Sequence, residues 1–169
     1  MIIRTLLILA VLVLNFHAAV LAQGKKTIVL VRHTEKDISG TADPNDPVLT
    51  AEGRKRAERL AKIVKKYRPG AIYSTDFKRT RETAAPMAER RKLKVEIYDA
   101  KKPAELIDAI TKSKTKRFVV VGHSNTIPGL ANLIGKKELF KNLDDAEYGA
   151  IWIIRIKDGQ LRKIEILPY

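Results

Sequence analysis

Short apolar runs alternate along this chain with longer segments in which apolar residues recur every three or four positions. Runs rich in β-branched residues predict buried strands, and the Asp158-Gly159 pair between the last two runs is typical of a tight hairpin turn. The predicted strands are 27–31, 71–73, 93–98, 117–122, 150–156 and 161–167. The last two are therefore expected to be antiparallel neighbours.

Amphipathic segments between these strands predict helices. Thr50 is a suitable N-cap for the first of them, and Asn125 or Thr126 for the last. The predicted helices are 51–67, 78–90, 103–112 and a last one from 125 or 126 to about 135. Pro86 should kink or break the second of them. Strands alternating with helices, followed by a hairpin, predict an α/β fold: a three-layer sandwich with a mostly parallel central sheet and an antiparallel C-terminal hairpin edge.

The first 22 residues differ from the rest of the chain. A short basic start carrying Arg4 precedes an apolar stretch, and small residues stand before Gln23. This pattern predicts a signal peptide over 1–22, cleaved after Ala22, and a single domain over 23–169 in an exported protein, periplasmic or secreted. The alternative is an uncleaved membrane anchor, although polar residues interrupt the apolar stretch and it is short for a span.

Composition narrows the possible partners. The chain has no cysteine, so core packing alone must stabilise it, and no cysteine follows the predicted cut to carry a lipid. Its net charge of +14 becomes +13 when residues 1–22 are removed, because Arg4 is lost with no acidic residue. Such a charge favours phosphorylated small molecules or glycolipids, and peripheral contact with an anionic membrane surface. No nucleic-acid motif appears, so nucleic acid is not an expected partner.

Three segments place a cation or an imidazole just after a predicted strand. Arg32-His33 follows 27–31, Arg79 lies in the first turn of helix 78–90, and His123 follows 117–122. Ligands of α/β proteins bind at the carboxyl ends of strands, guanidinium groups bind phosphate, and a neutral imidazole is a nucleophile toward phosphorus. Each feature alone is more often structural, but their repetition predicts one site that binds a phosphoryl group.

Four motifs resemble the histidine phosphatase superfamily, the phosphoglycerate-mutase-like group. They occur in that family's order, and Arg32-His33 combined with the late Gly-His pair is the most specific element. The motifs are Val31-Arg32-His33-Thr34-Glu35, Leu49-Thr50-Ala51-Glu52-Gly53, Ser74 through Arg79 with Thr83-Ala84, and Gly122-His123-Ser124.

This resemblance implies a mechanism without metal or cofactor. His33 would attack phosphorus and carry the phosphoryl group, while Arg32, Arg79 and His123 would surround its oxygens. Independently, the sequence shows no metal-ligand spacing. The chain departs from the family at Thr34, where glycine or alanine is common and where a hydroxyl could bind phosphate or only fill space. It departs again in the helix 51–67, where the family often has glutamine two residues before an alanine. Here Arg56 stands directly before Ala57.

The residue that protonates the leaving oxygen is the least determined part of the predicted site. The resemblance places it after the third strand, where Asp99 is the leading candidate, with Glu35 or Glu105 as alternatives. Without such an acid, substrates with good leaving groups, such as phosphoramidates or acyl phosphates, would be favoured.

The resulting hypothesis is an exported, metal-independent phosphatase that hydrolyses phosphomonoesters through a phosphohistidine intermediate. A mutase is disfavoured, because the chain is too short for the insertions that cover mutase sites. Two alternatives stay open: a phosphohistidine protein phosphatase and a non-catalytic phosphate-binding module.

Overall fold

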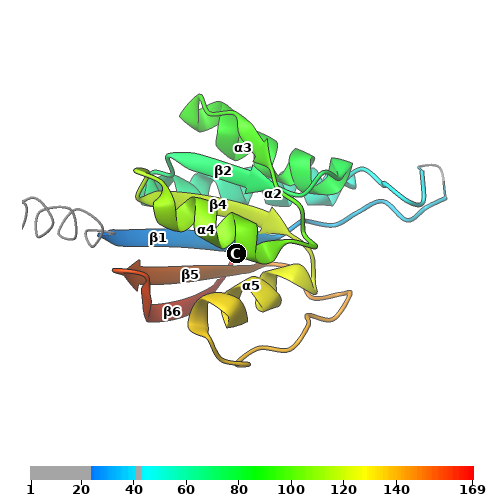
Figure 1. Ribbon diagram of the computed structural model, residues 1–169. Coiled ribbons are helices and arrows are strands. Elements are labelled where there is room, and N and C mark those ends of the chain that lie inside the picture. Colours follow the sequence, from blue (N-terminus) through cyan, green and yellow to red (C-terminus); the bar gives the residue numbers. More distant parts are fainter. Residues whose placement is uncertain (1–23, 41–42) are drawn as a thin grey trace, which may run out of the picture.

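In the computed structural model, which describes residues 24–40 and 43–169, a mixed sheet of six strands has the order β3-β2-β4-β1-β5-β6 (Figure 1). Strands β1 to β4 are parallel, whereas β5 runs antiparallel to both β1 and β6. This topology confirms the predicted fold class. The strands are β1 (Lys25–Arg32), β2 (Ala71–Ser74), β3 (Val95–Ile97), β4 (Arg117–Gly122), β5 (Ala150–Lys157) and β6 (Gln160–Pro168).

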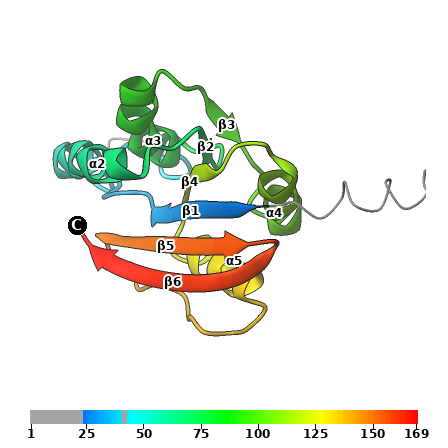
Figure 2. The same cartoon turned by 90° about the vertical axis from the view of Figure 1, so that its left-hand side faces the viewer.

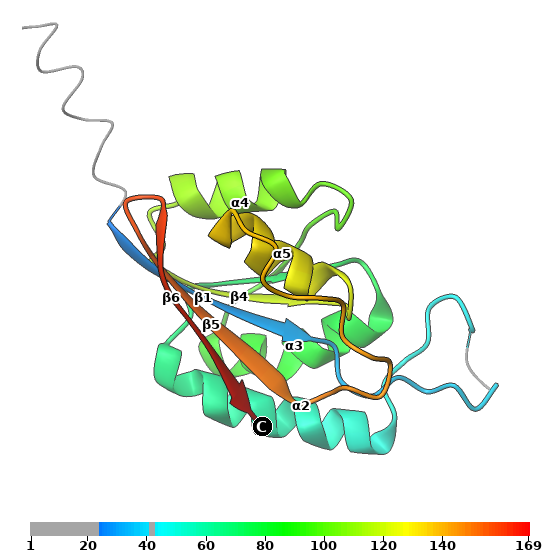
Figure 3. The same ribbon diagram turned by 90° about the horizontal axis from the view of Figure 1, so that it is seen from below.

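Helices cover both faces of this sheet and produce the three layers (Figure 3). Along β1, Ile28 and Leu30 pack in the cluster that contains α4 and α5, whereas Val29 and Val31 pack in the cluster that contains α2 and α3. Because the segment 28–31 of β1 is buried on both faces, its sequence is a continuous apolar run. The helices of the described residues are α2 (Ala51–Val64), the 3-10 helix η1 (Lys65–Tyr67), α3 (Lys78–Arg91), α4 (Pro103–Lys112) and α5 (Thr126–Gly135).

Several boundaries differ from those predicted. The helix expected over 51–67 changes to the tighter η1 after Val64, and the strand expected over 93–98 is only β3. The prediction that Pro86 could break this helix is wrong, because α3 continues through the proline without interruption. Buried residues on both sides of the proline, Ala84 and Met87, hold the two turns against the sheet.

The hairpin prediction is confirmed at the C-terminal edge of the sheet (Figure 2). Lys157 pairs with Gln160, and the two residues between them, Asp158 and Gly159, have φ angles of 53° and 73°. Positive φ at both central positions is the requirement of a type I′ turn, which matches the twist of paired strands. The Asp-Gly pair therefore sets the register next to the turn, and an irregularity between Arg155 and Ile156 shifts the pairing of the rest of β5 and β6 by one residue.

The predicted signal peptide, residues 1–22, lies outside the described residues. Among residues 24–40 and 43–169, no helix is both long enough and apolar enough to cross a membrane.

Candidate active site

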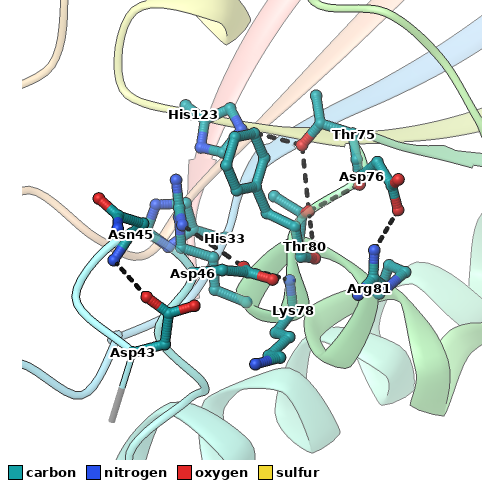
Figure 4. Close-up of polar contacts among 12 residues, drawn as sticks. His33, Asp43, Asn45, Asp46, Thr75, Asp76, Lys78, Thr80, Arg81 and His123 are labelled. Atoms are coloured by element: carbon teal, nitrogen blue, oxygen red, sulfur yellow. Dashed lines mark hydrogen bonds and ion pairs between the residues drawn. The ribbon is translucent and has the colours of Figure 1, made fainter.

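Strand register brings the two predicted histidines together. Parallel pairing sets Arg32 at the end of β1 beside Gly122 at the end of β4, and the backbone N–H of His33 donates to the carbonyl of Gly122 at 2.9 Å. His33 comes directly after Arg32, and His123 directly after Gly122. The centroids of the two imidazole rings therefore lie only 5.4 Å apart (Figure 4). Residues separated by ninety positions in the sequence thus share one edge of the sheet.

His33 is held as a neutral imidazole with one free nitrogen. Its side chain is only 4% exposed, and its Nδ1 lies 2.8 Å from the carbonyl oxygen of Thr34. Because a carbonyl can only accept, Nδ1 carries the proton and Nε2 keeps its lone pair. Burial lowers the pKa of His33 to about 3, and the nearby charges of His123, Arg32 and Arg79 act in the same direction. Nε2 is therefore available as a nucleophile at neutral pH.

Arg32 is anchored by the segment that precedes β5. Its Nη1 donates to the backbone carbonyls of Asp144 and Glu147 at 2.7 and 2.9 Å, and its guanidinium lies 4.2 Å from the ring centroid of Tyr148. The Asp145 carboxylate stands 3.7 Å from Nη2 but is 96% exposed, so solvent screens it. These contacts orient the buried guanidinium by neutral carbonyls and leave its charge largely uncompensated.

Arg79, in the first turn of α3, has fewer partners. Its guanidinium lies 4.3 Å from the ring centroid of Phe77, and its Nη1 is 3.9 Å from Oδ1 of Asp46. Its Nε is buried and has no hydrogen-bond partner within the described residues. Burial lowers the pKa of Arg79, and the charge of Asp46 acts in the opposite direction. A guanidinium keeps its proton at neutral pH, so Arg79 is a cation. A half-buried cation with spare donors is suited to an anionic ligand.

His123 contacts the end of β2 rather than a carboxylate. Its Nε2 lies 2.9 Å from Oγ1 of Thr75, and the Phe77 ring meets it edge-on at 5.1 Å between centroids. Burial lowers the pKa of His123 to about 4, and the charges of Arg79 and Arg32 contribute. Both site histidines are therefore neutral at pH 7 when no anion is bound.

Thr34 joins three of the four motifs and does not face a ligand. Its hydroxyl is fully buried and donates to the carbonyl of Gly53 at 2.8 Å, while its backbone N–H donates to Oγ1 of Thr83 at 3.1 Å. Thr83 in turn donates to the carbonyl of Arg79 at 2.7 Å. Of the two roles left open for Thr34, the structure favours the structural one: it fixes α2 and α3 to the loop after His33.

Gly53 has no room for a side chain at this joint, since an added Cβ would overlap the backbone oxygen of Glu35. We expect Gly53→Ala to lower the free energy of unfolding by about 1–3 kcal/mol, as overpacking does, and to lower catalytic activity by displacing the loop after His33. Thermal unfolding and steady-state kinetics would measure both effects. The matched control is Gly129→Ala in α5, where an added Cβ meets nothing within 4 Å and helix propensity favours alanine. Equal stability changes in the two variants would contradict the expectation.

The three carboxylates considered as proton donors lie in different surroundings. Glu35 is paired with Arg56 at 2.6 Å, and exposed Glu105 lies 3.3 Å from Lys102. Asp99 is exposed just after β3, and its Oδ1 accepts from the backbone N–H of Lys101 at 2.8 Å. Among the described residues, no carboxylate is hydrogen-bonded to either site histidine.

Asp99 nevertheless borders the site through a hollow of about 400 Å³. This hollow lies between the carboxyl ends of β2 and β3, and its wall includes Thr75, which contacts His123. It is lined by Thr75, Asp76, Phe77, Ile97, Tyr98, Asp99, Ala100 and Lys101.

Sequence reasoning missed several side chains at the site: Tyr148, which contacts Arg32, and also Asp46 and Thr75, which Figure 4 labels. Asp46 comes from the loop after β1, accepts from the backbone N–H of Lys78 at 2.7 Å and faces Arg79. Nothing in the Asp-Pro turn signals around Asp46 indicates that contact. Thr75, however, follows a strand as His33 and His123 do, and that shared position was a usable signal.

No cluster of three or more histidine, cysteine, aspartate or glutamate residues in the described part of the chain is arranged to hold a metal ion. Arg32 and Arg79 are the cationic side chains that the fold positions beside the two histidines.

Comparisons with known proteins agree with this geometry. Residues 28–102 match the profile of the Histidine phosphatase superfamily (branch 1), whereas no curated protein sequence matches the chain. The alpha-ribazole phosphatase of Shigella flexneri superposes with a TM-score of 0.71 at 14% identity, covering 85% of this chain and 96% of that one.

Two further solved structures show the same fold. A mycobacterial glucosyl-3-phosphoglycerate phosphatase, in complex with inorganic phosphate, has a TM-score of 0.67 at 15% identity and covers 85% of this chain and 96% of its own. A protein of Agrobacterium tumefaciens assigned as the phosphohistidine phosphatase SixA has a TM-score of 0.64 at 21% identity and covers 85% and 99%. The profile match over residues 28–102, together with the paired histidines and arginines at one sheet edge, makes this chain similar to the histidine phosphatase superfamily (branch 1).

Proposed function

We propose that this protein is an exported, metal-independent phosphatase that hydrolyses phosphomonoesters through a phosphohistidine at His33. Its enzyme class is phosphoric monoester hydrolase. The observation that carries the proposal is the free Nε2 of His33, held neutral beside His123 and flanked by buried Arg32 and half-buried Arg79.

The reaction has two displacements at phosphorus. In the first, Nε2 of His33 forms a bond to phosphorus while the bond to the leaving oxygen breaks, and that oxygen takes up a proton. In the second, water attacks the phosphohistidine, the N–P bond breaks, and phosphate leaves with the water's oxygen. Arg32, Arg79 and His123 would stabilise the negative charge of the phosphoryl oxygens in both transition states.

The substrate class we propose is a phosphorylated small molecule or glycolipid. The +14 charge of the chain favours anionic substrates, and the hollow of about 400 Å³ beside Thr75 offers a place for the leaving group. A basic surface would also permit peripheral contact with an anionic membrane, where a phosphorylated glycolipid would be met.

Asp99 is the proton donor that we propose for the leaving group. It lies on the wall of this hollow, at the same sheet edge as the two histidines. We expect Asp99→Asn to lower kcat about 10²-fold or more on the phosphate of a simple alcohol, because general acids typically contribute that much. On p-nitrophenyl phosphate, whose leaving group is already a good one, the change should be small.

Steady-state kinetics on the two substrates would measure this difference. The control is Glu105→Gln, which removes a charge from an exposed residue paired with Lys102. Equal activity of Asp99→Asn and wild type on the alcohol phosphate would remove Asp99 from the reaction.

A phosphohistidine protein phosphatase is the second candidate. Since no described carboxylate is hydrogen-bonded to His33 or His123, substrates that need little help from an acid are favoured, and a phosphoramidate such as phosphohistidine is one. A higher kcat/KM on phosphohistidine peptides than on any phosphomonoester would support this candidate over the first.

A phosphatase screen with lipid, sugar and nucleotide phosphates on purified protein lacking residues 1–22 tests the main proposal. We expect phosphate release that resists EDTA. Loss of activity in EDTA would contradict a metal-free mechanism. Retained phosphate binding without turnover on the whole panel would instead indicate a non-catalytic module.

Export is tested separately. Full-length protein made in bacteria should appear in the periplasm with Gln23 as its first residue.

A further inference from the structure

A chain of hydroxyl groups at the start of α3 ends on His123 (Figure 4). Oγ1 of Thr80 lies 2.9 Å from the carbonyl oxygens of Thr75 and of Phe77. Oγ1 of Thr75 lies 3.0 Å from Oγ1 of Thr80 and 2.9 Å from Nε2 of His123. Both threonine side chains are buried, at 2% and 0% exposure, so the protein contacts, rather than solvent, decide their hydrogen bonds.

The direction of each hydrogen bond follows from counting protons. Thr80 has a single hydroxyl proton, and carbonyl oxygens only accept, so that proton goes to a carbonyl. Thr80 must then accept the hydroxyl proton of Thr75. With its only proton used, Thr75 can only accept from Nε2 of His123. In the neutral imidazole, Nε2 therefore carries the proton and Nδ1 is a bare acceptor.

That tautomer has a consequence for a bound phosphoryl group. Figure 4 shows the other ring nitrogen of His123 on the side of the ring toward His33. A lone pair there would repel a phosphoryl oxygen, whereas an N–H would donate to it. A neutral His123 held by Thr75 cannot supply that N–H unless it takes up a proton.

We propose that Thr75, oriented by Thr80, is a positioning residue that fixes His123 as the Nε2–H tautomer, so that phosphoryl binding is coupled to uptake of one proton at Nδ1. The inference rests on the proposed function only for the identity of the anion. The proton comes from solvent or from the hydroxyl of a phosphate monoanion. The bond from that donor to the proton breaks, the bond from Nδ1 to the proton forms, and no other covalent bond changes. The low pKa of His123, about 4, agrees with a neutral ring before binding, and the anion supplies the negative charge that stabilises the imidazolium.

The charged groups that face His123 act on this proton in opposite directions. Arg79 and Arg32 oppose protonation, and so does Lys36 from the loop after β1. Asp46 faces Arg79 from that same loop and partly offsets its charge, and a phosphate dianion would reverse the balance. The coupling is therefore expected to appear only when an anion occupies the site.

The first test reads the tautomer directly, by ¹⁵N–¹H correlation NMR of the full-length protein in phosphate-free buffer at neutral pH. The chain has three histidines, and substitution of His17 and of His33 assigns their signals. We expect protonated Nε2 in His123 and protonated Nδ1 in His33. Thr80→Val frees the hydroxyl proton of Thr75 to donate to His123, so this variant should shift the tautomer toward Nδ1–H.

Two further variants separate positioning from folding. Thr75→Ser keeps the hydroxyl and should keep the Nε2–H tautomer, whereas Thr75→Val removes it and should give a mixture. Protonated Nδ1 of His123 in the wild type, or an unchanged tautomer in both valine variants, would overturn the proposal.

The second test measures proton uptake by titrating inorganic phosphate calorimetrically in buffers of different ionisation enthalpy. At about pH 8.5, where phosphate is a dianion, the wild type should take up about one proton per phosphate bound, and Thr80→Val less than about half of that. Equal uptake by both proteins would contradict the coupling. No phosphate binding by the wild type would overturn both the coupling and the proposed function, whereas the tautomer measurement is independent of that function.

Discussion

His33→Ala should abolish phosphatase turnover, with kcat falling by a factor on the order of 10⁶, as when the nucleophile of a covalent mechanism is removed. The physical reason is specific to one atom. Nδ1 of His33 is committed to the carbonyl of Thr34, so only Nε2 can attack, and alanine offers no replacement. Steady-state release of phosphate from p-nitrophenyl phosphate measures the loss, and ³¹P NMR of protein quenched in alkali should detect phosphohistidine in the wild type only.

Asn125→Ala at the N-cap of α5 is a suitable control, since that side chain makes no capping hydrogen bond. Equal turnover by wild type and His33→Ala would remove His33 from the nucleophile role.

The buried, neutral His33 should also affect the stability of the protein in acid. The pKa of His33 is lowered to about 3 in the folded protein, so between that value and about 6.5 the unfolded state binds more protons. Stability should therefore fall as pH drops below about 6.5, and less steeply in His33→Ala.

Much of the fold follows from local pattern in the chain. The strands 27–31 and 117–122 are predicted because burial on both faces requires unbroken apolar runs, and the Asp158-Gly159 turn because only certain residues adopt positive φ easily. Boundaries are less readable. The transition at Val64 from α2 to η1 depends on how the next segment packs, and no local periodicity encodes that.

The candidate site likewise has one part that the sequence predicts and one part that it does not. His33, Arg32 and His123 are visible in the sequence because each ends an apolar run, and strand register then sets them side by side. The partners of Arg32 are backbone carbonyls of Asp144 and Glu147, and any residue type would supply those. Contacts made by main-chain atoms leave no trace in side-chain identity, so these could not be predicted.

Arg79→Ala is the second variant with a large expected effect, a loss of about 2.7–4 kcal/mol of transition-state stabilisation, by analogy with single oxyanion donors. Unlike Arg32, this guanidinium is not held by backbone carbonyls: within the described residues it has an aromatic ring on one side and Asp46 at 3.9 Å. Its donors are therefore available to a phosphoryl group. We expect kcat/KM to fall about 10²–10³-fold with little change in thermal unfolding, measured on p-nitrophenyl phosphate.

Arg81→Ala supplies the matched control, since Arg81 lies two residues along the same helix, pairs with exposed Asp76 and should change kcat/KM less than about twofold. Part of the Arg79→Ala loss should come from Asp46, whose carboxylate is then left facing the phosphate with no cation between them. Adding Asp46→Asn keeps an oxygen that can accept from the backbone N–H of Lys78 and removes only the charge. The double variant should therefore recover part of the lost phosphate affinity. An Arg79→Ala enzyme with near-normal kinetics would place the phosphoryl group elsewhere in the site.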